Sequence, residues 1–406
     1  MTSDVPPDPV DASAHEPSGE TLRALVLYFA RLGTIGFGGP AALVGYMRRD
    51  LVERRAAVHE DTYNLALALA QIMPGPLAAQ TAIAIGYFHH GVLGATLVGL
   101  AFVLPSFAMV LGLSALYVAF GGLPAVQALF YGIGAVVIAI IAHAAYRLAR
   151  STNKRDPLLW AVFAMLFVAT VWSGTELAAL FIAAGLAIVC ARAWPGARRG
   201  VVIAAVCVAG AALVWGTERL LLSTDAFAGG ESVPLQILLF FTKAGAFVFG
   251  SGLAIVPFLR QGVVDDFGWL TEHQFLDAVA IALITPGPVV ITVAFIGYLV
   301  AGLPGATLAA LGIFLPVWVL TVIPAPWFVR HRDNAQLRAF SDGATAAASG
   351  AIAGAVVVLA QRALVDIPTI GIAVASLGAL WRFKIPEPLF VLAAGVAGLV
   401  LWTFAR

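Results

Sequence analysis

The sequence predicts an all-α polytopic membrane protein with two inverted-topology repeats, broken or re-entrant helices and about 13 hydrophobic segments. Three observations predict it: an apolar composition, an internal repeat, and Gly or Pro interruptions in the opening segments of each half. Hydrophobic residues make up 61% of the chain and charged residues 11%, with a mean hydropathy of +0.95. Soluble domains carry about 25% charged residues. A chain this apolar requires lipid as its solvent.

Composition also excludes several classes of protein. The net charge of +1, without a basic stretch that alternates with aromatic residues, argues against a nucleic-acid partner. Cys190 and Cys207 lie in apolar runs without metal or redox spacing, and the 7 histidines are scattered. We therefore expect no metal site and no cofactor. Residues 1–19 combine acidic residues with prolines and lack the basic start and apolar core of a signal peptide, which predicts a disordered tail.

The chain contains one pattern twice. Residues 28–33 and 37–40 return as residues 240–245 and 249–252, and the Pro-Gly-Pro of residues 74–76 returns at 286–288, all at an offset of 212. After a one-residue gap, the Gly-Ala-Thr-Leu of residues 94–97 returns at 305–308. Several motifs in the same order indicate duplication, which in a membrane chain is typical of transporters. We assign residues 20–199 to the first transporter repeat, 200–234 to a linker span and 235–406 to the second, inverted repeat.

The apolar segments fall into two kinds. Each half opens with two segments interrupted by Gly or Pro, at residues 22–50, 61–89, 235–260 and 272–300. Each arm of an interrupted segment holds about 14 residues, or about 21 Å of helix, which is too short for a hydrocarbon core of about 30 Å. We expect these segments to be re-entrant. Nine unbroken segments should cross the membrane: 92–120, 124–149, 157–172, 175–192, 201–222, 304–324, 340–361, 366–381 and 387–404.

Positive residues give the orientation, because cytoplasmic loops are enriched in Lys and Arg. If the nine segments cross, five basic clusters fall on one side: Arg48, Arg49, Arg54 and Arg55; Arg147, Arg150, Lys154 and Arg155; Arg192, Arg198 and Arg199; Arg330, Arg332 and Arg338; Arg382 and Lys384. We therefore expect a multi-pass protein of the bacterial inner membrane with a cytoplasmic N-terminus and a periplasmic C-terminus.

The interruptions are the candidate substrate site. A helix break at membrane depth frees backbone groups that must face protein or a water-filled cavity, and glycines there let an anion approach free N–H groups. Such breaks can also be simple kinks or helix-packing points. Their occurrence as matched pairs favours a binding role. The candidate residues at the breaks are Gly38, Gly39, Pro40, Gln71, Pro74, Gly75, Pro76, Gly250, Ser251, Gly252, Thr285, Pro286, Gly287 and Pro288.

Arg31 and Lys243 occupy the same repeat position within otherwise apolar arms. A cation inside a membrane segment is costly and usually functional, so this pair could neutralise a dianion. Both side chains could instead reach the interface and remain in water. Small polar side chains near the breaks, including Thr34, Gln80, Thr81 and Thr292, could donate to oxyanion oxygens or satisfy broken backbone equally well.

Coupling to a proton gradient would need a titrating group. The ionisable candidates within or beside the spans are Asp277, Asp342, Glu176 and His143. Neither aspartate recurs in the other half, because Asp277 corresponds to Leu65 and Asp342 to Tyr131. We therefore expect each of them to be an interface or structural residue.

The motif combination resembles the long, two-domain chromate transporter family. Phe-Gly-Gly-Pro at 37–40 and Pro-Gly-Pro at 74–76, followed by Phe-Gly-Ser-Gly at 249–252 and Thr-Pro-Gly-Pro at 285–288, carry this resemblance over nearly the whole of residues 20–404. The resemblance implies two antiparallel domains and export of chromate from the cytoplasm, which confers chromate resistance and is driven by the membrane potential or a proton gradient. Ser251 stands where the first repeat has Gly39, so the two halves are not equivalent.

Other functions remain open at this level. Sulfate or another tetrahedral oxyanion shares the charge and shape of chromate, and no residue separates the two. A membrane enzyme would need a nucleophile with a matched base or a metal pair, and none is apparent. A channel fits inverted repeats with paired hairpins less well than alternating access does. Besides the substrate and the lipid bilayer, a homodimer partner is compatible with the sequence.

Overall fold

The structure is a computed structural model that describes residues 21–173, 178–193, 232–247, 252–331, 334–383 and 386–405. Every regular element within these ranges is helical, which confirms the predicted all-α architecture. The described elements of the first repeat are α1 (Leu22–Ile35), α2 (Gly39–Met47), π-helical η1 (Arg48–Arg54), α3 (Glu60–Ile72), α4 (Leu77–Phe120), α5 (Pro124–Asn153), α6 (Pro157–Ser173) and α7 (Ala178–Ala193).

The second repeat follows the same order, but the equivalents of α2 and α4 are divided into shorter elements. Its described elements are α9 (Val233–Ala246), η2 (Gly252–Ile255), α10 (Val256–Arg260), π-helical η3 (Gln261–Asp266), α11 (Glu272–Ile284), η4 (Val289–Ile291), α12 (Thr292–Val322), α13 (Ala325–His331), α14 (Ala335–Ala363), α15 (Ile367–Arg382) and α16 (Glu387–Ala405). The predicted linker span at 201–222 lies outside the described residues.

The long helices α4 and α12 each reverse direction at the same repeat position. Gly91 has φ 60° and ψ −150°, and Gly302 has φ 61° and ψ −150°, in the left-handed φ range that glycine tolerates. Gly86 and Gly94 would lie about 12 Å apart on a straight helix. A Cβ on Gly94 would instead lie 2.2 Å from the Gly86 carbonyl oxygen, so the chain folds back on itself. This reversal separates each re-entrant arm from the long helix that follows it.

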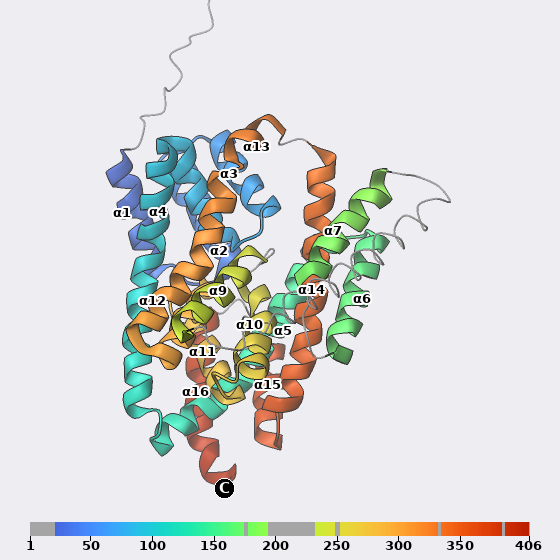
Figure 1. The fold of residues 1–406 in the computed structure, drawn as a ribbon. Helices are drawn as coiled ribbons and strands as arrows, with labels where there is room; N and C mark the ends of the chain where they lie inside the picture. Colours follow the sequence, from blue (N-terminus) through green and yellow to red (C-terminus); the bar gives the residue numbers. More distant parts are fainter. Residues whose placement is uncertain are drawn as a thin grey trace, which may run out of the picture.

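The repeats point in opposite directions. In Figure 1, α4 ends at the lower end of the molecule, whereas α13, the equivalent of the last turns of α4, lies at the upper end beside α3. The C-terminus lies at the lower end. This arrangement agrees with the predicted inversion of the second repeat.

The repeats are also interleaved, because the last two helices of each pack against the other. Helices α15 and α16 pack on α5, while α6 and α7 pack on α14. Glycines permit both contacts: a Cβ on Gly132 in α5 would lie 2.0 Å from the Ala394 carbonyl oxygen, and one on Gly343 in α14 would lie 2.7 Å from the Ala184 carbonyl oxygen. Such close helix approach is typical of small residues in membranes.

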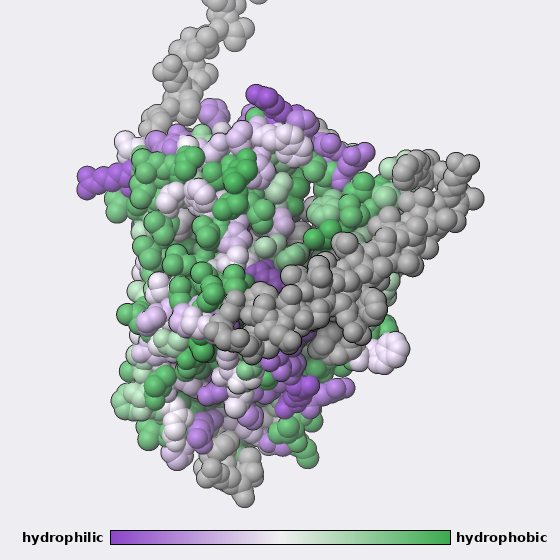
Figure 2. Space-filling model, in the orientation of Figure 1, coloured by the Kyte–Doolittle hydropathy of each residue, from purple (hydrophilic) through white to green (hydrophobic). Residues whose placement is uncertain are grey.

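Four described helices are long and apolar enough to cross a membrane: Leu77–Phe120, Pro124–Asn153, Val289–Val322 and Ala335–Ala363. The other predicted crossings that the structure describes are shorter apolar helices, among them α6, α7, α15 and α16. Figure 2 shows hydrophobic residues over much of the flank formed by α1, α4 and α12, and hydrophilic residues gathered at the end that carries α13. The surface therefore resembles that of a protein embedded in lipid.

The interleaved packing predicts a difference between two neighbouring glycines of α5. Gly132→Ala should destabilise the protein by about 1–3 kcal/mol, because the new methyl group would overlap α16. Gly134→Ala is the matched control, since its Cβ would meet only the Leu276 side chain at 4.0 Å. Thermal unfolding in detergent measures both. Equal melting temperatures for the two variants would contradict the close contact between α5 and α16.

Candidate functional site

The first break lies between α1 and α2. The Gly36 N–H still donates to the Leu32 carbonyl at 2.7 Å, after which Gly38 (φ 112°) and Gly39 (φ 72°) leave helical geometry. Helix α2 begins at Gly39 with Pro40 in its first turn and without a side-chain cap. Gly38, Gly39 and Pro40 are half-buried. The Glu387 carboxylate of α16 comes within 3.9 Å of where a Cβ on Gly39 would stand, so an acidic group of the second repeat faces this break.

The second break lies between α3 and α4. Gly75 adopts φ 147°, and Pro76 precedes the first turn of α4. The Gln80 side chain is fully buried, and its Nε2 donates to the Pro74 carbonyl at 2.7 Å. The Gln71 side chain is exposed, whereas its carbonyl accepts from Ser341 Oγ on α14 at 2.6 Å. The second repeat thus satisfies backbone of the first at this break as well.

The first and fourth breaks meet. Gly287 (φ 100°), between α11 and η4, donates its N–H to the Gly36 carbonyl at 2.9 Å. Beside it, the buried Ser106 hydroxyl of α4 donates to the Gly33 carbonyl at 3.1 Å. Thr285, Pro286, Gly287 and Pro288 are all buried. We call the contact of Gly33, Gly36, Ser106 and Gly287 the break junction.

The third break is only partly described. Gly250 and Ser251 lie outside the described residues, and Gly252 is buried at the start of η2. A Cβ on Gly252 would lie 3.1 Å from Val290 Cγ2 in η4. The third and fourth breaks therefore lie side by side.

The small hydroxyls near the breaks donate within their own helices. Thr285 Oγ1 donates to the Ile281 carbonyl at 2.6 Å, and Thr34 Oγ1 donates to the Ala30 carbonyl at 2.8 Å. Thr81 and Thr292 donate in the same way, to Leu77 and Val289. These bonds correspond to the alternative in which such groups satisfy backbone, and they leave the hydroxyl oxygens as acceptors.

Arg31 and Lys243 lie on exposed faces of α1 and α9, whereas the glycines of the break junction are buried. Lys243 Nζ lies 5.9 Å from the centroid of the Phe258 ring. Such an exposed arrangement is expected of a side chain that reaches water, so the two alternatives for this pair remain open. Their role in binding stays a prediction.

The four ionisable candidates have different surroundings. Asp342 on α14 accepts from Arg192 of α7 at 2.8 Å, and Arg192 also donates to Asp156 at 3.0 Å. Burial opposes ionisation of Asp156, but the hydrogen bonds from Arg192 and from backbone N–H groups outweigh it and hold the pKa of Asp156 below its usual range. This cluster ties the first repeat to the second. Asp277 accepts from Tyr117, and His143 is half-buried on α5. Glu176 lies outside the described residues.

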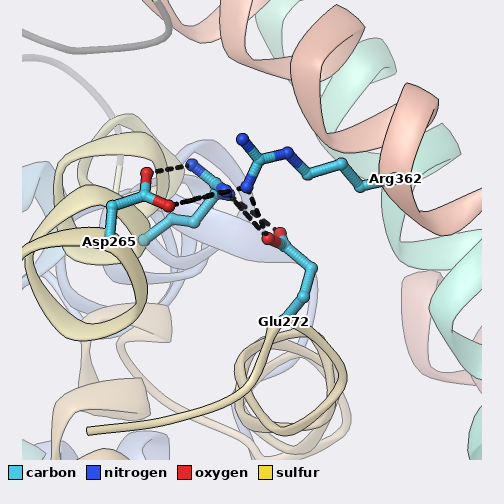
Figure 3. A network of polar contacts seen from close by, with 4 residues as sticks. Asp265, Glu272 and Arg362 are labelled. Carbon is cyan, nitrogen blue, oxygen red and sulfur yellow. Dashed lines mark hydrogen bonds and ion pairs between the residues drawn. The ribbon is translucent and has the colours of Figure 1, made fainter. Parts of the chain in front are cut away.

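A network of charged side chains surrounds the buried Arg260 at the end of α10 (Figure 3). The Arg260 side chain is 4% exposed; it donates to Asp265 at 2.7 Å and to Glu272 at 2.8 Å. Arg362 reaches across from α14 and pairs with Glu272 at 3.2 Å and with Asp265 at 3.5 Å. The network fastens η3 and α11 to α14. We call these four residues the Arg260 network.

The first repeat has an equivalent but open network. Arg48 pairs with Glu60 at 2.7 Å and Glu53 at 3.6 Å, at positions that correspond to Arg260, Glu272 and Asp265. Here the Arg48 side chain is 50% exposed, and Ser151 occupies the position equivalent to Arg362. The end of the second repeat is thus clamped to a long helix, while the matching end of the first repeat is not.

Sequence reasoning did not identify these networks, although the signal was present. Arg48 and Arg260 share the 212-residue offset of the breaks, as do the carboxylates that they bind. Ser106 gave no such signal, because it corresponds to Val317. Glu387 corresponds to Glu176 at the 211-residue offset of the later motifs, a match that the sequence reasoning missed.

The fold and the meeting breaks define a class: a polytopic membrane transporter of two inverted, interleaved repeats with broken helices. The chromate transporter family model matches residues 23–191 and 235–399, one match for each repeat. The chain therefore belongs to the chromate transporter family.

Three relatives are similar over most of the chain. The chromate transport protein of Cupriavidus metallidurans is 52% identical over 99% of both chains. The probable chromate transport protein of Synechococcus elongatus is 49% identical over 97% of this chain and 99% of its own length. The chromate transport protein of Pseudomonas aeruginosa is 32% identical over 91% of this chain and 90% of its own length. No solved structure matches the chain.

The two charge networks predict unequal effects of equivalent substitutions. Arg260→Gln should destabilise the protein by about 2–3 kcal/mol, because it removes a buried cation that donates hydrogen bonds to two partly exposed carboxylates. Arg48→Gln, the matched control in the first repeat, should cost no more than about 1 kcal/mol, because that pair is exposed. Thermal unfolding in detergent compares them. Similar losses of stability for both variants would mean that the Arg260 side chain is not buried in the folded protein.

Proposed function

We propose that this chain is a secondary transporter that exports chromate across the inner membrane and so confers chromate resistance. Membership of the chromate transporter family and the names of its full-length relatives support the substrate. The observation in the structure that carries the proposal is the break junction, where the Gly287 N–H of one repeat meets the Gly36 carbonyl of the other. Transporter sites lie at such repeat interfaces, near the membrane midplane.

The breaks could supply the hydrogen-bond donors that a dianion needs. Gly38, Gly39, Gly75 and Gly287 adopt positive φ, and their lack of a Cβ would let an anion approach backbone N–H groups at the breaks. The half-buried break at residues 38–40 is the more open approach, and the buried break at residues 285–288 forms the opposing wall. Rearrangement of the junction would release the Gly287 N–H to the anion, because this donor already has a partner in the described state.

The exposed cations Arg31 and Lys243 would act before the dianion is desolvated. An exposed positive charge attracts a dianion through solvent and raises its concentration near the breaks, an effect that salt screens. Sulfate would feel the same attraction, and it remains the second candidate substrate because its charge and shape match those of chromate.

The unequal charge networks support alternating access. The Arg260 network clamps η3 and α11 to α14, while the equivalent end of the first repeat is unclamped. We assign the unclamped end to the cytoplasm, because Arg48, Arg147 and Arg330 belong to the basic clusters at that end. The N-terminus would then be cytoplasmic and the C-terminus periplasmic. Each chain carries both repeats, so a homodimer is not required to complete the site.

Purified protein in liposomes tests this function. Wild type should take up labelled chromate with saturation, and excess sulfate should inhibit uptake in proportion to its own affinity. Arg31→Ala and Lys243→Ala should raise the KM at low ionic strength, with the difference from wild type shrinking as salt screens the charge. Lys243→Arg should resemble wild type, because the charge is kept.

The control for these variants is Arg23→Ala, an exposed cation at the start of α1 and two turns from Arg31. Uptake that rises linearly with concentration and ignores sulfate would contradict a carrier. A KM that is the same for Arg31→Ala, Lys243→Ala and wild type would remove these cations from the site.

A further inference from the structure

Asp277 is a carboxylate buried in the middle of α11. Its residue is 9% exposed, and its neighbours Leu276 and Ala278 are buried in the main apolar cluster. A buried carboxylate is costly to keep ionised unless a cation or several hydrogen bonds compensate for the lost hydration. The groups around Asp277 therefore decide whether it is only a structural hydrogen-bond acceptor or can also bind a proton.

The hydrogen bond to Asp277 comes from a tyrosine on a helix of the other repeat. Tyr117 Oη, near the end of α4, donates to Asp277 Oδ2 at 2.7 Å. The Tyr117 ring packs edge-on against Phe130 of α5 at 5.5 Å and Phe295 of α12 at 5.1 Å. Aromatic rings thus cover the pair, and the phenol hydroxyl is its polar partner.

Among the described residues, Asp277 forms no ion pair. Tyr117 is the titratable group that faces it. Several charged side chains on the elements packed against α11 have partners other than Asp277: Arg260 and Arg362 pair with Asp265 and Glu272, Asp342 pairs with Arg192, Arg150 donates to Tyr146, and Arg147 lies near Glu387. No described cation neutralises Asp277, so a proton is the available counter-charge.

The first repeat shows that this contact needs no carboxylate. Leu65 of α3 and Phe328 of α13 occupy the positions equivalent to Asp277 and Tyr117; Phe328 is buried in an apolar cluster, and Leu65 packs against that cluster. The equivalent pair of elements therefore has hydrocarbon side chains at these two positions. A buried acid that packing does not require, on the arm that leads directly to Gly287, indicates a separate role.

We propose that Asp277 is a proton-binding site, with Tyr117 as its positioning partner, and that its protonation is coupled to movement of the break junction. The site takes one proton, which converts the carboxylate to a neutral acid without any other bond change. When Asp277 is ionised, the bond from Tyr117 holds α11 against α4 of the other repeat; when it is neutral, that bond weakens and α11 can shift Gly287 away from Gly36. This inference rests on the proposed chromate transport.

The experiment uses the full chain in liposomes with labelled chromate and two readouts: accumulation driven by an imposed pH gradient, and exchange of external for internal chromate without a gradient. Wild type should show both. Asp277→Asn should lose the gradient-driven accumulation while it still exchanges chromate, and Asp277→Glu should restore the response to the gradient. A defect that is purely structural would reduce both readouts together and would not be rescued by glutamate.

Tyr117→Phe gives a second, milder test. The hydroxyl favours the ionised carboxylate, so its removal should move the midpoint of the pH profile of transport to a higher pH. Tyr131→Phe is the matched control, because Tyr131 donates to Asp366, which caps α15 through the Thr369 N–H and lies away from the breaks. Its midpoint should stay at the wild-type value.

The outcomes separate the two claims. A wild type that moves no chromate in either assay overturns the proposed function, and the inference falls with it. A wild type that does move chromate, with a gradient response that survives Asp277→Asn and a pH midpoint that Tyr117→Phe leaves unchanged, overturns the inference alone.

Discussion

The structure depends on one constraint: backbone groups freed by a helix break inside a membrane need partners within the protein, because lipid offers none and each unsatisfied group costs several kcal/mol. The hydrogen bond from Gly287 to Gly36 meets this constraint across the repeat interface. Ser341 of the second repeat also donates across the interface, to the Gln71 carbonyl, while Ser106 donates to the Gly33 carbonyl within the first repeat. The other repeat therefore helps to complete the broken backbone, and under the proposed function an anion that enters would replace a bond that already exists.

Interleaving of the repeats gives the breaks a rigid frame. Because α6 and α7 pack on α14, and α15 and α16 pack on α5, neither repeat can move as a separate domain without disturbing the other. The two ends of this frame differ, since Arg260 is buried whereas Arg48, its first-repeat equivalent, is exposed. That difference is what an alternating-access protein captured in one state would display.

Much of this fold was predictable from local chemistry. The breaks follow from Gly and Pro, and positive φ at Gly38, Gly75 and Gly287 agrees with that expectation. The packing of α15 and α16 on α5 was not predictable, because Gly132 and its contact Ala394 are distant in sequence and lie in segments of similar apolar composition. Asp277 was interpreted as structural because Leu65 breaks the repeat pattern. The structure reverses this interpretation: Leu65 packs at the equivalent position without a charge, so the carboxylate of Asp277 is the feature that calls for a function.

The central claim is that the oxyanion binds where the breaks of the two repeats meet. A crystal structure with bound chromate, phased near the chromium absorption edge, would test it directly, because anomalous density locates chromium independently of the protein. The account predicts a chromium peak beside residues 36–40 and 285–288, with the bond between Gly287 and Gly36 altered. A peak away from both breaks, with that bond intact, would contradict it.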